Sequence, residues 1–357
     1  MQPGDSNRDD QFQGDIHRLR GVAILLIVAT HCVAFLSWGG HETAFDFAHD
    51  LFDNSTLIFM FISGYLFHHN SANFRYTRYL KGKMRNVIAP YLIAATPGIL
   101  YVLLFDAERL RALGLDGHPS AEKAGYLLVY GGAQLNYALW FIPVMCLYYL
   151  VSPVLLRVFE RPNGYALLLL LIPLSVLMHR PSYNHGHNIA LALYFLSAYA
   201  IGMLCSKYHD KVVAVLDRHV AILVLASIVG IVGHLFLSTH HGNYSVVSIG
   251  AFDHRDGWID WLFIQKVLVT FALWALLRRY SSLRLPVLDA LASASFTIYF
   301  LHLYVLYIVA SAAHSAGFEV SVAAFVGLLV LAVALPVAVA AAVRKIAPRW
   351  SRTLIGS

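Results

Sequence analysis

Ten long apolar runs constrain the fold of this chain more than any other feature of its sequence. About 20 helical residues cross a hydrocarbon core of about 30 Å, and each run is close to that length. The chain is 59% hydrophobic and only 13% charged, about half the charged fraction of a soluble domain. The sequence therefore predicts an integral membrane protein with ten candidate spans: 21–38, 50–67, 87–105, 135–156, 163–178, 188–205, 219–237, 258–277, 294–313 and 320–343.

The ten runs favour an all-α bundle. Within lipid, only helices and closed barrels satisfy all backbone hydrogen bonds. The runs lack the alternation of apolar and polar residues that is typical of barrel strands. No polar linker is long enough to separate two folded units, so we expect one transmembrane domain over 21–343 between polar tails at 1–20 and 344–357. The first apolar segment follows a polar tail of 20 residues and shows no small-residue cleavage site before the next loop, so we expect the first span to remain in place as an anchor.

The lysines and arginines predict the orientation of the bundle. Twenty of the 26 flank the spans on the side of the N-terminus, five lie on the opposite side, and Lys266 lies within a span. Because cytoplasmic loops carry the excess of such residues, both termini are expected in the cytoplasm. The same bias, together with the attraction of these cations to anionic lipids of the bilayer, explains the net charge of +6. No nucleic-acid partner is therefore expected.

Neither a metal site nor a disulfide framework is expected. Cys32, Cys146 and Cys205 lie in separate apolar runs without pair spacing, as buried small hydrophobes do. The histidines of the external loops are scattered and show no ligand spacing.

Arg20 lies directly before the first span, and His31 lies within it. Eleven residues at about 100° each come to roughly 20° past three turns, so both side chains share one helix face about 16 Å apart. Arg20 then lies at the inner surface and His31 near the midplane, where an ionisable residue is a candidate for a functional site. The alternative for His31 is a hydrogen bond between helices.

Five cationic residues follow the second span within a short loop: Arg75, Arg78, Lys81, Lys83 and Arg85. Together with Arg20 they predict a positive pocket at the inner face. Such a pocket suits a polyphosphate ligand or an anionic lipid equally well. Positive loops are also the default at this face.

Further candidates for a cavity lining lie in other spans, namely Ser63, Tyr65, Trp140, Tyr299, His302 and Lys266. Ser63 could be a nucleophile, but a Ser-Gly pair more often permits close helix packing. His302 could share the cavity of His31, and a hydrogen-bonded core histidine is equally consistent. Lys266 could extend toward water or pair with Asp260.

These motifs together resemble the acyltransferase-3 family of bacterial integral-membrane O-acyltransferases. The resemblance rests on the Arg20/His31 spacing and on the Ser-Gly-Tyr motif at the end of segment 59–65, which lies in the last part of the second span. It also rests on Arg75-x-x-Arg78 with its basic run before Pro90-Tyr91, on Leu139-Trp140-Phe141, and on Tyr299-x-x-His302.

The resemblance implies a function and roles for these residues. It implies acetyl-CoA as a cytoplasmic donor substrate, with no permanently bound cofactor, and a sugar hydroxyl of a cell-surface or lipid-linked polysaccharide as the acceptor. It implies that His31 is catalytic and that Arg20 and the loop arginines bind the donor. It also implies a stand-alone member, without an extracytoplasmic hydrolase-like domain, in the bacterial inner membrane. A neutral imidazole suits a general base for this transfer. The alternative is a membrane carrier or flippase for a lipid-linked or anionic solute.

Overall fold

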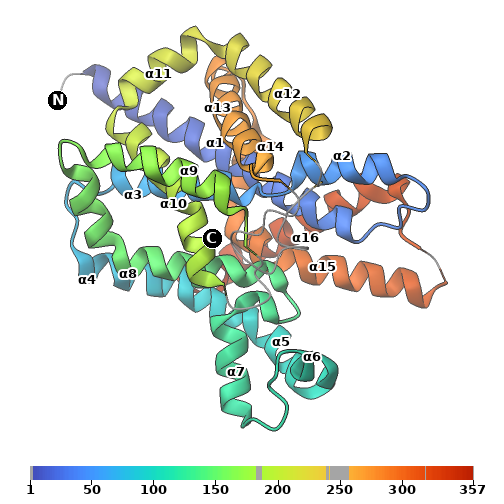
Figure 1. Ribbon diagram of the computed structural model, residues 1–357. Coiled ribbons are helices and arrows are strands. Elements are labelled where there is room, and N and C mark those ends of the chain that lie inside the picture. Colours follow the sequence, from blue (N-terminus) through green and yellow to red (C-terminus); the bar gives the residue numbers. More distant parts are fainter. Residues whose placement is uncertain (1–2, 182–186, 239–240, 242–256, 318, 357) are drawn as a thin grey trace.

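A computed structural model describes residues 3–181, 187–238, 241, 257–317 and 319–356, with side chains from residue 14 onward. The described residues form helices and, apart from an isolated bridge between Ser37 and Ser321, no β structure. The predicted all-α class is therefore confirmed (Figure 1).

Eight helices in the described part of the chain are long and apolar enough to cross a membrane. They are α1 (Pro3–Ala34, apolar over Gly14–Ala34), the continuous stretch of α4, η1 and α5 (Tyr76–Phe105), η3 with α8 (Tyr137–Glu160), α10 (Asn188–Lys207), α12 (Val220–Leu237), α13 (Trp261–Arg279), α15 (Ser295–Ser315) and η6 with α16 (Val322–Ile346). The shorter elements are α2 (Glu42–Phe52), α3 (Thr56–His69), α6 (Ala107–Ala112), α7 (Ser120–Val129), η2 (Gly131–Ala133), η4 with α9 (Gly164–Met178), α11 (His209–Arg218), α14 (Pro286–Ser293) and α17 (Ser351–Ile355).

Two of the ten predicted spans form helices too short to count among the eight of spanning length. The run 50–67 contains a break after α2, and α3 has only 14 residues. Asn54 lies in that break with a left-handed φ of 58°, which ends the preceding helix. The run 163–178 begins as the 3₁₀ turn η4, and the helix ends before His179, whose φ is 52°.

Helix α1 packs against helices from both halves of the chain: α2, α3, α13, α14, α15 and α16. Two ion pairs fix its inner end, meaning the end that the charge distribution predicts to be cytoplasmic. Arg278 Nη1 lies 2.9 Å from Asp15 Oδ2, and Arg18 Nε lies 3.1 Å from Asp289 Oδ1. In Figure 1, α6 and α7 lie at one edge of the molecule and α11 and α12 at the opposite edge.

Helices α3 and α10 pack with their backbones in close approach. Gly64 of α3 faces the carbonyl oxygen of Tyr199, and Gly202 of α10 faces the carbonyl oxygen of Phe61. A Cβ atom at either glycine would overlap the facing oxygen, so glycine is required at this crossing. The Ser63-Gly64 pair thus lies at a tight helix contact.

We predict that Gly202→Ala lowers the free energy of unfolding by about 1–3 kcal/mol, because two packed backbones must separate to admit the methyl group. Thermal unfolding of the purified protein in detergent measures the change. Gly327→Ala is the matched control, since a Cβ at Gly327 of α16 meets no atom within 4 Å. Equal melting temperatures for the two variants would contradict the prediction.

Candidate functional site

One face of α1 opens onto two cavities. Ile27 and His31 line a small cavity of about 30 Å³, here called the His31 cavity. His17 and Arg20 line a larger cavity of about 730 Å³ on the inner side, here called the Arg20 cavity. The structure therefore places Arg20 and His31 on the common helix face that their spacing predicts.

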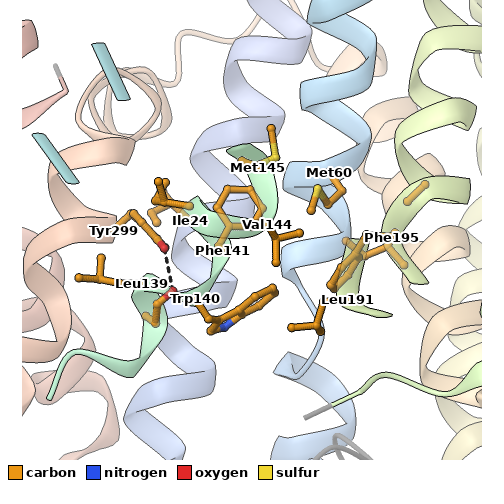
Figure 2. Close-up of a cluster of buried hydrophobic side chains, with 14 of the residues drawn as sticks. Ile24, Met60, Leu139, Trp140, Phe141, Val144, Met145, Leu191, Phe195 and Tyr299 are labelled. Carbon is orange, nitrogen blue, oxygen red and sulfur yellow. Dashed lines mark hydrogen bonds between the residues drawn. The ribbon is translucent and has the colours of Figure 1, made fainter. Parts of the chain in front are cut away.

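The His31 cavity lies among aromatic and apolar side chains. Trp140 and Phe141 enter it from the start of α8, and Tyr299 enters from α15. Figure 2 shows these rings converging, with Tyr299 Oη donating a hydrogen bond of 2.7 Å to the carbonyl oxygen of Ala138. The other lining residues are Ile27, Thr56, Phe59, Ala138, Ser295 and Phe296. Such a wall holds few polar groups that could retain water.

The imidazole of His31 lies beside a second imidazole. Its ring centroid is 5.1 Å from that of His302 and 5.2 Å from that of Tyr137, which it meets edge to face. His302 is fully buried, and its Nδ1 lies 2.9 Å from the carbonyl oxygens of both Ile298 and Tyr299. Because a carbonyl only accepts, Nδ1 of His302 carries a proton, and Nε2 of the neutral ring carries the lone pair.

Among the described residues, four cations and no acidic side chain line the Arg20 cavity. Arg20, Arg78, Lys83 and Arg352 line it, together with His17. Lys83 Nζ lies 4.9 Å from the ring centroid of Tyr149 and 5.2 Å from that of Tyr79, which also line the cavity. A concentration of positive charge without carboxylates is suited to an anionic ligand.

Arg20 differs from the other cations near the inner end of α1. Arg18 and Arg278 form ion pairs, whereas no carboxylate of the described residues lies within 4.0 Å of Arg20. The Nε atom of Arg20 is buried without a hydrogen-bond partner there, and Nη2 lies 3.4 Å from Nδ1 of His17. The guanidinium therefore retains hydrogen-bonding capacity for a ligand.

The two cavities adjoin. Phe59, Ser295 and Phe296 line both of them, so the wall between the cavities consists of one residue of α3 and the first two residues of α15. Ser63 lines the Arg20 cavity and is absent from the lining of the His31 cavity. The cationic cavity and the His31 cavity are thus neighbours, separated by these three side chains.

Several other predicted candidates lie away from these cavities. Arg75, Lys81 and Arg85 are exposed and do not line the Arg20 cavity, although Arg75 and Arg78 share a surface hollow on the inner side. Arg85 Nε donates a hydrogen bond of 3.4 Å to Thr353 Oγ1. Tyr65 is fully buried in the core, where its hydroxyl lies 2.9 Å from Nδ1 of His209.

Lys266 binds the end of α2. Its ammonium is 1% exposed and donates to the carbonyl oxygens of Leu51, at 2.5 Å, and Asp50, at 3.4 Å. Gln265 donates to the same Asp50 oxygen at 2.7 Å. These carbonyls lie in the last turn of α2, which leaves them without partners inside their own helix. The structure thus gives Lys266 a structural role at the helix break.

Asp260 and Arg180 form part of a second buried polar group, on the outer side. Burial raises the pKa of Asp260 to about 6, while hydrogen bonds from the Phe263 backbone and the Tyr194 hydroxyl, both 2.8 Å, oppose the rise. Arg180 is only 5% exposed, and its Cζ lies 5.0 Å from the ring centroid of Trp140. Asp260 thus holds the start of α13 next to the wall of the His31 cavity.

Two functional candidates have no signal in the sequence. Arg352 lies in a basic segment that resembles any cytoplasmic tail, and Arg180 resembles any external arginine. Both acquire their positions only through folding: Arg352 lines the same cavity as Arg20, and Arg180 lies next to Trp140.

We predict that Lys266→Met lowers the free energy of unfolding by roughly 1–3 kcal/mol, because buried carbonyls of α2 lose their donor. The measurement is thermal unfolding in detergent. Lys345→Met, at an exposed position in the last turn of α16, is the control. A Lys266→Met protein as stable as Lys345→Met would refute the assigned role.

The family described as "Acyltransferase domain", the acyltransferase-3 family, matches residues 14–341. The match covers nearly the whole chain, including every residue of the His31 cavity. No curated protein and no solved structure matches the chain. The chain therefore belongs to the acyltransferase-3 family, and it is a multi-pass integral membrane protein.

Proposed function

We propose that this member of the acyltransferase-3 family transfers an acetyl group from cytoplasmic acetyl-CoA to a hydroxyl of a cell-surface or lipid-linked polysaccharide in the bacterial inner membrane. His31 acts as the general base. The observation that carries the proposal is the adjacency of a cationic cavity and a histidine cavity on one face of α1.

The Arg20 cavity supports the donor half of the proposal. Arg20, Arg78 and Lys83 provide charge for the phosphates of CoA, and the pantetheine arm extends past Phe59 and Ser295. Arg20 and His31 are about 16 Å apart along α1, a distance that an extended pantetheine arm can cover. The thioester then lies next to the imidazole.

The His31 cavity supports the chemical step. His31 accepts the proton of the acceptor hydroxyl while the hydroxyl oxygen attacks the thioester carbonyl carbon. The C–S bond then breaks, and the imidazolium returns the proton to the departing sulfur, which leaves free CoA and an O-acetyl ester. The apolar wall excludes the water that would otherwise hydrolyse the thioester.

The position of Ser63 favours direct transfer over a covalent acyl-serine. Ser63 lines the Arg20 cavity, whereas His31 lines the neighbouring one. A nucleophilic serine needs its general base within hydrogen-bond reach. In direct transfer the acceptor hydroxyl is the nucleophile and His31 is its general base, so Ser63 is not needed.

We predict that His31→Ala abolishes O-acetylation of the surface polysaccharide, because the acceptor hydroxyl loses its base. Mass spectrometry of polysaccharide from expressing cells measures the acetyl groups. His314→Ala is the matched control, since His314 is exposed near the far end of α15. Normal acetylation with folded His31→Ala protein would rule out the mechanism.

Release of free CoA distinguishes an acyltransferase from a carrier or flippase. Purified protein with acetyl-CoA and isolated polysaccharide releases free thiol if it catalyses transfer, and a carrier releases none. The family membership favours the enzyme.

We predict that His302→Gln lowers kcat about 10–100-fold and leaves KM for acetyl-CoA unchanged. His302 does not line the Arg20 cavity, and its ring centroid lies 5.1 Å from that of His31, so we expect it to act by positioning the His31 ring. The measurement is initial-rate kinetics over a pH series, in which His302→Gln also shifts the pH profile. A rise in KM with constant kcat would contradict this positioning role.

A further inference from the structure

The C-terminal helix α17 is fixed against the inner side of the bundle. Thr297 of α15 donates a hydrogen bond of 3.1 Å to the carbonyl oxygen of Ile355, and Arg85 donates to the hydroxyl of Thr353 at 3.4 Å. Gly356 follows the helix with φ of +71°, and a Cβ there would lie 2.9 Å from Cβ of Phe296. The helix also contacts α5, η1 and α16.

This attachment makes α17 part of the Arg20 cavity. Arg352 and Gly356 line the cavity, and Phe296, against which Gly356 packs, lines both cavities. Among the described residues, no carboxylate lies within 4.0 Å of Arg352. The α17 segment thus adds a fourth cation to Arg20, Arg78 and Lys83.

Aromatic rings line the same cavity beside these cations. The ring centroid of Phe74 lies 5.7 Å from that of Phe67 and 5.4 Å from that of Tyr79. A purine base stacks on such rings, whereas a phospholipid headgroup offers no flat ring. Several phosphates joined to a base therefore match the cavity better than the single phosphate of a common anionic lipid.

We infer that Arg352 is a phosphate ligand of a nucleotide-bearing acyl donor, and that α17 is an integral wall of the donor site. This inference rests on the proposed function, because the donor is the one that the function requires. Arg352 contacts the phosphates and takes no part in the chemistry at His31. Arg85 acts indirectly, by holding Thr353 and with it the helix that carries Arg352.

The test is calorimetric titration of the purified full-length protein in lipid-free detergent with CoA, and with pantetheine, which has no phosphate. Arg352→Ala is expected to raise Kd for CoA at least about 10-fold, as the loss of a charge-assisted hydrogen bond does. Arg349→Ala, three residues earlier at an exposed position outside the cavity, is expected to bind CoA as the wild type does. Arg352→Lys, which keeps the charge, is expected to have a Kd for CoA between those of the wild type and Arg352→Ala.

Pantetheine and lipid complete the test. Pantetheine is expected to bind Arg352→Ala and wild-type protein with equal affinity. If Arg352→Ala lost affinity for CoA and for pantetheine to the same extent, the inference would be overturned in favour of a structural role for Arg352. CoA binding by Arg352→Ala that matches Arg349→Ala would overturn it outright. Displacement of CoA by micromolar phosphatidylglycerol from the wild type, but not from Arg352→Ala, would instead assign Arg352 to a lipid.

The inference and the proposed function fail separately. Wild-type protein that binds CoA through Arg352 but acetylates no polysaccharide overturns the function and supports Arg352 as a nucleotide ligand. Polysaccharide acetylation with an unchanged Kd in Arg352→Ala overturns only the role of Arg352.

Discussion

The packing of α1 is the constraint on which the site depends. Its inner end is held by ion pairs of Asp15 with Arg278 and of Arg18 with Asp289. Arg20 follows only two residues after Arg18, yet it lines a cavity to which the described residues contribute no carboxylate. Burying a charge without a partner is costly, and an evolved protein retains such a residue where a ligand supplies the opposite charge. The paired cations hold the helix in place, whereas Arg20, which has no carboxylate partner among the described residues, faces the proposed donor site.

Helical periodicity was enough to predict part of this site from the sequence. The spacing of Arg20 and His31 fixes a common face, and the basic run after α3 predicts positive charge at the inner side. Which of those cations line the cavity depends on tertiary packing: α4 and the π-helical turn Met84–Ile88 direct Lys83 inward, whereas Lys81 is exposed. The adjacency of His31 and His302 depends on how α1 packs on α15, which no local pattern encodes.

The break between α2 and α3 shows why hydropathy alone overestimates a span. Asp53, Asn54 and Ser55 interrupt the apolar run, and residues of this kind favour turns because their side chains compete for backbone hydrogen bonds. A broken helix within a membrane leaves carbonyls that protein groups must satisfy. Lys266 and Gln265 do so from α13. An ionisable residue in a span is therefore not by itself evidence of catalysis.

Under the proposed function, the division into two adjoining cavities separates donor binding from acyl transfer. Interactions with phosphates far from the reacting carbon are equal in ground and transition states, but they fix the thioester in place and lower the entropic cost of reaction. The cations that provide them would bind water and ions if they surrounded the thioester itself. Phe59, Ser295 and Phe296 keep the cationic cavity apart from the apolar one. Because Gly356 packs on Phe296, the segment that carries Arg352 also supports this wall. Under the proposed function, donor binding and enclosure of the His31 cavity therefore share one structural element.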